Sequence, residues 1–211
     1  YGGVRWMVLG PPGPALPADI LTEPFVYASL AERYATICYT LGRYLGLLFF
    51  PHPLTIDYSP FHIVLLDWTQ GAVWLSVLVY LALLLYAGWG LRRRSIVGYG
   101  ILCYLATLSL VSNLPFSTGT FMSERFAFAP SLGFAIAIGW LLSTPALPAI
   151  RYRKYAVLPL ALAGTVATQG RNAVWKDDVT LFTTDVVTSA NSIKANLAAS
   201  VTLEDSDAAA A

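Results

Sequence analysis

The sequence has little charge of either sign. Only 12% of its 211 residues are Asp, Glu, Lys or Arg, whereas soluble domains carry about 25%. Hydrophobic residues make up 56%, and the mean hydropathy is +0.61. A net charge of +1 supplies neither the basic field that attracts nucleic acid nor the acidic excess of disordered chains. These shortages exclude a soluble globular domain and predict an integral membrane protein that binds no nucleic acid.

Several patterns of enzymes and metal sites are also missing. The sequence has no Gly-rich phosphate loop and no nucleophile elbow. Its two histidines, His52 and His62, have no Cys or second carboxylate at metal-ligand spacing. The two cysteines, Cys38 and Cys103, lie inside apolar segments and are predicted to pack as small hydrophobic side chains. No soluble-enzyme mechanism and no metal site can be built from these residues, and dependence on a divalent metal stays open.

Long apolar segments occupy most of the chain. About 20 helical residues cross the hydrocarbon core of a bilayer, and residues 72–91 are twenty in a row without a charge. Residues 96–112 and 126–142 are predicted to form further spans. Residues 155–168 form a fourth, although this length also suits a buried or interfacial helix. We therefore expect four transmembrane helices within residues 71–169.

Basic residues orient these helices. Short cytoplasmic loops are enriched in Lys and Arg, and the two basic clusters, at residues 92–94 and 151–154, fall on the same side of the predicted helices. Both are predicted to be cytoplasmic. Residues 51–70, residues 113–125 and everything after Gln169 then face the lumen or periplasm. That last part alternates polar and apolar residues as amphipathic soluble helices do, with Asp177 and Asp178 suited to the start of the first helix.

A fifth apolar segment, residues 34–50, contains Arg43 in its middle. If the segment crossed the membrane, the preceding residues 10–31 would be cytoplasmic, yet they include five prolines and no Lys or Arg before Arg33. A buried Arg costs at least about 2.5 kcal/mol and usually faces protein, water or a phosphate. We therefore favour a re-entrant or interfacial helix, with both ends on the lumenal side, over a spanning helix.

The predicted fold is an all-α polytopic membrane helical bundle. Residues 1–33 are predicted to form a lumenal or periplasmic loop after a truncated helix. The chain begins without an initiator Met and is interpreted as part of a longer protein. Residues 34–70 hold the re-entrant helix and a lumenal loop, residues 71–169 the four spans, and residues 170–211 a soluble helical segment.

Polar residues gather in three clusters on the predicted lumenal side. The first, residues 50–60, has three prolines that fix an extended path and place Asp57 and Tyr58 at the membrane edge. These residues could be a helix cap and part of an aromatic belt, or they could line a substrate cavity.

The second cluster contains Glu124 and Arg125. The two could simply pair with neighbouring residues or anchor the interface, or Arg125 could bind a phosphate with Glu124 holding it in place. The third cluster, residues 169–178, is predicted as a structural joint between the membrane part and the soluble segment, in preference to a direct part in catalysis.

The motifs in these clusters follow one another in a recognisable order. They are Arg43-Tyr44-Leu45, Phe50-Pro51-His52-Pro53-Leu54 and Asp57-Tyr58-Ser59, then Ser123-Glu124-Arg125 and Pro130-Ser131-Leu132-Gly133-Phe134, then Arg171-Asn172, Trp175, Leu181-Phe182 and Lys194-Ala195. Together they resemble the transmembrane and tetratricopeptide-repeat O-mannosyltransferases and their prokaryotic relatives, whose membrane part has the C-type glycosyltransferase fold. The resemblance covers about residues 24–199. It implies that residues 170–211 are the start of a tetratricopeptide region.

This resemblance implies transfer of a sugar, typically mannose, from a polyprenyl-phosphate carrier to Ser or Thr hydroxyls of an acceptor protein, with inversion at the anomeric carbon. Such a reaction needs a carboxylate base and donors that hold the leaving phosphate. The family's acidic pair lies in an upstream loop, so no catalytic residue is expected here and these residues alone are expected to be inactive.

The resemblance and the residue types together suggest a donor-side site. Arg125, with Glu124, is predicted to bind the carrier phosphate. His52, Asp57, Tyr58 and Arg43 are the candidates for lining the cavity.

Other classes of membrane protein remain open. Broken helices, lumenal prolines and an intramembrane Arg also suit half of a transporter or flippase, and the helical segment suits a non-enzymatic anchor that presents repeats. The chain has no N-x-S/T sequon, which fits a prokaryotic source. We favour a multi-pass protein of the bacterial inner membrane, or of the endoplasmic reticulum if eukaryotic, with the C-terminal segment periplasmic or lumenal.

Overall fold

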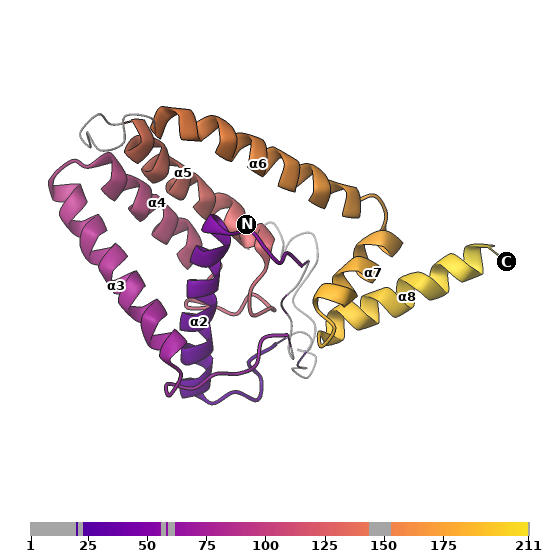
Figure 1. Ribbon diagram of the computed structural model, residues 1–211. Coiled ribbons are helices and arrows are strands. Elements are labelled where there is room, and N and C mark those ends of the chain that lie inside the picture. The colour runs from indigo at the N-terminus through magenta and orange to yellow at the C-terminus, as the bar shows by residue number, and fades with distance from the viewer. Residues whose placement is uncertain (1–19, 21–22, 56–57, 59–61, 144–152, 211) are drawn as a thin grey trace, which may run out of the picture.

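The computed structural model describes residue 20 and residues 23–55, 58, 62–143 and 153–210 (Figure 1). All regular elements within these residues are helices, as the sequence predicts. The α-helices are α2 (Leu30–Phe49), α3 (Gly71–Arg92), α4 (Ile96–Ser109), α5 (Phe128–Ser143), α6 (Arg153–Val174), α7 (Asp178–Thr188) and α8 (Ile193–Ala210), and a 3-10 helix, η1 (Glu124–Ala127), precedes α5.

Helix α2 is an unbroken helix that begins at a capping box. The Ser29 hydroxyl accepts a hydrogen bond from Glu32 N at 3.3 Å, and the Glu32 carboxylate accepts one from Ser29 N at 2.9 Å. This reciprocal pair satisfies two backbone donors that the first helical turn leaves free.

Helices α2 and α3 lie side by side and run in the same direction (Figure 1). Near the start of both, the Thr36 hydroxyl accepts a hydrogen bond from Leu66 N at 2.9 Å. Further along, Gly42 faces Ser76, whose Cβ lies 3.1 Å from where a Cβ of residue 42 would sit. The chain therefore travels out along α2 and returns before α3 begins.

Helices α3, α4 and α5 pack against one another through glycine contacts. Gly90 of α3 meets Gly98 of α4, and a Cβ at Gly90 would lie 2.8 Å from Gly98 Cα. Gly100 of α4 meets Gly133 of α5 in the same way. A Cβ at Gly100 would lie 2.7 Å from the Gly133 carbonyl oxygen. Between membrane helices the hydrophobic effect drives association only weakly, because lipid tails are as apolar as the side chains. Small residues there allow the backbones to approach closely and pack.

Within the described residues, two helical stretches are long and apolar enough to cross a membrane, Gly71–Arg92 and Glu124–Ser143. Only 17% of the most apolar window of each is buried within the protein, unlike the core helix of a soluble domain. They match the predicted spans at 72–91 and 126–142.

The other two predicted spans differ in length from the helices observed. Helix α4 has 14 residues and ends at Ser109 because the chain turns there. Asn113 has a positive φ of 62°, and its amide nitrogen donates to the carbonyl oxygens of Thr120 and Phe121 at 2.9 and 3.1 Å. Helix α6 extends beyond the predicted 155–168 at both ends and has 22 residues.

The C-terminal segment is a helical hairpin of α7 and α8 that follows α6 (Figure 1). Asp177 is the N-cap of α7, and its carboxylate accepts a hydrogen bond from Thr180 N at 2.7 Å. This confirms the prediction of acidic residues at the start of that helix. Leu181 and Ala195 are buried where the two helices meet.

Candidate functional site

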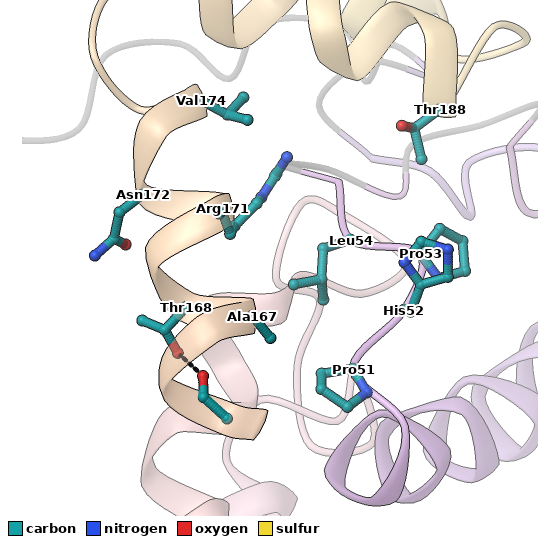
Figure 2. A pocket seen from close by; sticks show the side chains of 12 residues that line it. Pro51, His52, Pro53, Leu54, Ala167, Thr168, Arg171, Asn172, Val174 and Thr188 are labelled. Atoms are coloured by element: carbon teal, nitrogen blue, oxygen red, sulfur yellow. Dashed lines mark hydrogen bonds between the residues drawn. The ribbon is translucent and has the colours of Figure 1, made fainter. Parts of the chain in front are cut away.

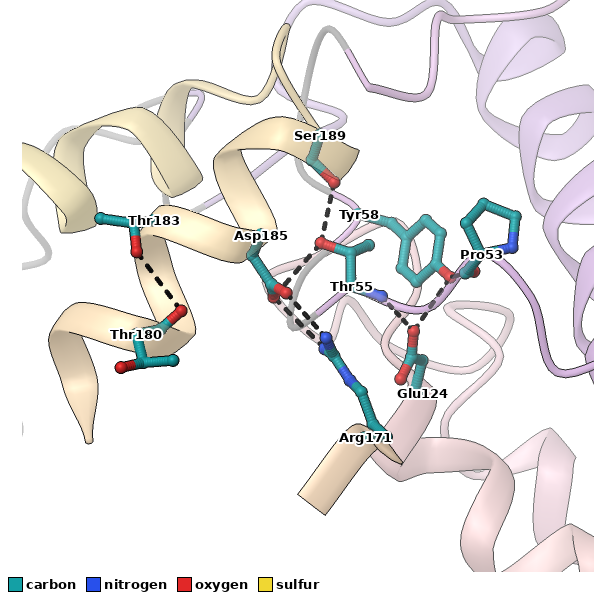
Figure 3. A network of polar contacts seen from close by, with 9 residues as sticks. All are labelled: Pro53, Thr55, Tyr58, Glu124, Arg171, Thr180, Thr183, Asp185 and Ser189. Atoms are coloured by element: carbon teal, nitrogen blue, oxygen red, sulfur yellow. Dashed lines mark hydrogen bonds and ion pairs between the residues drawn. The ribbon is translucent and has the colours of Figure 1, made fainter. Parts of the chain in front are cut away.

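Glu124 connects η1 to the Pro-rich loop. Its Oε1 atom accepts a hydrogen bond from Thr55 N and lies 3.2 Å from the Tyr58 hydroxyl, which donates to it (Figure 3). The same hydroxyl lies 3.3 Å from the Pro53 carbonyl oxygen. Oε2 of Glu124 receives no hydrogen bond from the described residues. Glu124 therefore fixes the loop through one oxygen and keeps the other available.

Arg171 and Asp185 form a buried ion pair between the end of α6 and α7. Arg171 Nη1 lies 3.0 Å from Asp185 Oδ1, with side-chain exposures of 17% and 0%. A charge buried to this degree is tolerated only when it is paired and hydrogen-bonded. The pair therefore connects α7 to the end of α6.

Thr55 joins these two sets of contacts. Its hydroxyl donates toward Asp185 Oδ2 at 3.5 Å and accepts a hydrogen bond from the Ser189 hydroxyl at 2.8 Å, while its backbone N–H bonds to Glu124. Figure 3 shows the loop, η1, α6 and α7 converging on this residue. We call Thr55, Glu124, Tyr58, Arg171, Asp185 and Ser189 the Thr55 network.

A cavity of about 630 Å³ lies beside the network, between the Pro-rich loop and the C-terminal half of α6 (Figure 2). Its walls include His52 and Leu54 from the loop and Thr168, Arg171 and Asn172 from α6. The Arg171 Nε atom is buried and has no hydrogen-bond partner. The cavity thus combines apolar walls with hydrogen-bonding groups, as small-molecule sites do.

Burial favours the neutral forms of Tyr58 and His62. Burial, followed by the negative charge of Glu124, raises the pKa of Tyr58. Burial, followed by the positive charge of Arg43, lowers the pKa of His62. Tyr58 is therefore a constant hydrogen-bond donor, and His62 contributes no positive charge at neutral pH.

The structure separates the predicted pair Glu124 and Arg125. Arg125 is exposed, makes no ion pair with the described residues, and lies over the Phe126 ring with 5.4 Å from Cζ to the ring centroid. Glu124 turns instead toward Thr55 and Tyr58. The two side chains thus have different partners, because neighbouring residues on a helical turn point in different directions. The binding of a phosphate by Arg125 and Glu124 stays a prediction.

The other predicted residues lie in two places. His52 lines the 630 Å³ cavity, and Tyr58 belongs to the Thr55 network. Arg43, on α2, lines two other cavities. Asp57 lies outside the described residues.

Sequence reasoning missed Thr55, Asp185 and Ser189. The sequence does indicate that Asp185 and Ser189 are buried. Leu181, Asp185 and Ser189 are spaced by four residues, so they share one face of a helix. An apolar Leu on that face predicts that its neighbours are buried too, as they are. Nothing in the sequence singles out Thr55.

No protein-family model, curated protein or solved structure matches the chain. Function is therefore inferred from the chemistry of this site and from the motifs of the sequence.

Proposed function

We propose that this chain is part of a multi-pass membrane glycosyltransferase. It transfers a sugar, with mannose the first to test, from a polyprenyl-phosphate carrier to Ser or Thr hydroxyls of a protein. The base that removes the hydroxyl proton comes from a part of the enzyme upstream of these residues. This chain contributes the donor side of the site and the joint to a periplasmic or lumenal helical segment.

One observation carries this proposal, namely the convergence of the three polar clusters. The loop bonds to Glu124 of the second cluster through Thr55 N, and to α7 through the Thr55 hydroxyl. His52 of the first cluster and Arg171 of the third line one cavity. A simple membrane anchor has no need for polar residues of separate segments to meet at the end of apolar helices.

Arg125 is the residue that best suits the carrier phosphate. It is exposed at the N-terminal end of the apolar helix α5 and carries no carboxylate partner among the described residues. A planar guanidinium binds phosphate oxygens in a bidentate manner. Glu124 acts as a positioning residue, because its carboxylate would repel a phosphate while its hydrogen bonds hold the loop that carries His52 and Tyr58.

The amphipathic donor fits a site at the edge of the bilayer. Its isoprenoid chain stays in the hydrocarbon beside α3 and α5, the two helices that are long and apolar enough to span. Its sugar reaches the cavity beside the Thr55 network. The protein is accordingly placed in the bacterial inner membrane, with α7 and α8 on the periplasmic side.

The test is sugar transfer by the complete protein in isolated membranes. Radiolabelled mannose on a polyprenyl-phosphate carrier is supplied, and label in protein is compared for wild type, Arg125→Ala and Arg93→Ala. Arg93 is a matched control, since it is also an exposed arginine and is the C-cap residue of α3. We expect the wild type to transfer label to protein. Arg125→Ala should transfer at least tenfold less, because removal of one donor to the transition state reduces the rate by at least that factor. Arg93→Ala should transfer as much label as wild type.

Two results would contradict parts of this proposal. Equal transfer by wild type and Arg125→Ala, at equal protein levels, would remove Arg125 from the site but keep the enzyme. Absence of transfer with every sugar carrier tried would favour an anchor or a transporter.

A further inference from the structure

Arg43 is a positive charge inside a largely apolar helix and has no partner among the described residues. It lies in the second half of α2, and it forms no hydrogen bond or ion pair with the described residues. The ion pair found among those residues joins Arg171 and Asp185. Because an unpaired guanidinium is costly near hydrocarbon, it normally meets water or an anionic group.

Two cavities meet at Arg43. One, of about 420 Å³, is an apolar groove between α2 and α3, and it is lined by Gly42, Leu45, Gly46, Phe49, Leu75 and Val79 as well as by Arg43. The other, of about 560 Å³, has polar groups in its wall, among them Tyr58, His62 and Gln70. Tyr39, Arg43 and Ala72 line both. The apolar groove and the polar cavity therefore adjoin each other, with Arg43 in the wall of both.

The groove is accessible from the surrounding lipid. Phe49 and Leu75, which line it, are 55% and 64% exposed, and Phe50 at its end is 79% exposed. Phe49 lies on α2 and Phe50 is its C-cap residue. Leu75 lies on α3, which is long and apolar enough to span a membrane. A lipid chain can reach the groove by lateral diffusion.

We propose that this groove binds an anionic glycerophospholipid. Its phosphodiester lies on Arg43, one acyl chain lies along Gly42 and Gly46, and the hydroxyls of its headgroup enter the polar cavity beside His62 and Gln70. Basic pockets between membrane helices recognise lipid headgroups through this combination of charge and apolar surface.

Charge favours a phosphodiester over a free polyprenyl phosphate. His62 adds no second positive charge, so the site offers one cation, which matches the single negative charge of a diester. A phosphate monoester carries about −1.5 to −2 at neutral pH. The polar cavity adjoins the cavity of the proposed reaction, since Pro53 lines both. Tyr58 connects the polar cavity to the Thr55 network. Its ring faces His62, with 5.2 Å between ring centroids, and its hydroxyl bonds to Glu124.

The experiment is lipid binding by the purified, delipidated full chain, measured by native mass spectrometry. The probes are phosphatidylglycerol, phosphatidylcholine, a polyprenyl phosphate and inorganic phosphate. We expect wild type to prefer phosphatidylglycerol over phosphatidylcholine about fivefold, the effect of one basic residue near a lipid headgroup. Arg43→Ala abolishes this preference, and Arg43→Lys retains part of it.

A second variant tests the groove without changing its charge. A Cβ at Gly46 meets nothing within 4 Å, so Gly46→Leu fits the fold but fills the chain site, and we expect weaker binding of phosphatidylglycerol. Gly139→Leu is the matched control, because a Cβ at Gly139 also meets nothing within 4 Å and the residue lies on α5, away from the groove. Its binding should equal that of wild type.

Three outcomes would overturn the proposal. Undiminished preference in Arg43→Ala would remove the cation. Tighter binding of the polyprenyl phosphate than of phosphatidylglycerol would assign the groove to the carrier. Displacement of phosphatidylglycerol by inorganic phosphate alone would show a site that does not use the lipid chain. None of these results bears on sugar transfer, which is measured independently.

Discussion

Two regions of this protein are held together by different physics. Helices α3, α4 and α5 meet through backbone contacts at glycines such as Gly100 and Gly133. The Thr55 network is held by hydrogen bonds and an ion pair between segments up to 134 residues apart. The first region tolerates no added volume, and the second tolerates no unpaired charge. The comparison teaches that the bundle is specified by residue size and the site by polar partners.

The largest loss of stability is expected for Asp185→Ala, in the Thr55 network. The substitution leaves the Arg171 guanidinium, 17% exposed, without its partner, and breaking a buried pair costs about 3–5 kcal/mol. We expect that loss in the free energy of unfolding, measured by denaturant titration in micelles. Glu204→Ala, an exposed acid on α8, should change it little. Arg171→Met combined with Asp185→Leu should restore most of the stability; if it does not, the pair contributes more than charge compensation.

The matching test of the bundle is Gly133→Ala. The new Cβ would lie 2.9 Å from Tyr104 Cα and closer still to the Gly100 carbonyl oxygen. Because backbone atoms cannot move aside locally, we expect a loss of about 1–3 kcal/mol in the same titration. Gly139→Ala, on the same helix and facing open space, serves as control. Equal stability of the two variants would show that the α4–α5 contact is loose.

Tyr58→Phe sharpens the comparison within the network. It removes the hydroxyl that bonds to Glu124 at 3.2 Å but keeps the ring, and a hydrogen bond to a charged group contributes about 1.5–3 kcal/mol. We expect a loss at the lower end of that range, and none for Tyr27→Phe, whose side chain is 78% exposed.

The difference in stability between wild type and Tyr58→Phe should depend on pH in a definite direction. The pKa of Tyr58 is raised on folding, so the folded state retains the phenol proton more strongly than the unfolded state. Its contribution is complete below the ordinary tyrosine pKa of 10 and decreases above it. The stability gap between wild type and Tyr58→Phe should therefore narrow between pH 10 and pH 11. A constant gap would contradict the buried environment of the hydroxyl.

The smallest expected effect is that of Asp177→Ala at the start of α7. The carboxylate accepts a hydrogen bond from Thr180 N at 2.7 Å, and loss of such a cap costs about 1 kcal/mol. Faster amide exchange of Thr180 should report the change. Asp177→Asn should exchange nearly as slowly as wild type, since Asn also caps helices. A large effect on the whole chain would mean that the cap takes part in the Thr55 network.

The sequence predicted the bundle better than the site. A charge-free run predicts α3 within one residue of its bounds, because exclusion of charge from lipid is a local property. Helix α4 is shorter than predicted, since the turn at Asn113 depends on contacts with Thr120 and Phe121.

The site was only half predictable. The three clusters were identified from residue type, but their partners were not, since Thr55 has no distinctive neighbours in the sequence. Adjacency suggested that Glu124 serves Arg125, whereas the fold turns Glu124 toward the loop.

The position of Thr55 has a consequence for the time course of synthesis. Its partners Glu124 and Asp185 lie 69 and 130 residues further along the chain. Ribosomes add about 5–20 residues per second, so about 6–26 seconds pass between the synthesis of Thr55 and that of Asp185. During this interval water must satisfy the polar groups of the Pro-rich loop. The loop is closed only when α7 arrives, and closure of the site is therefore a late event in the biogenesis of the protein.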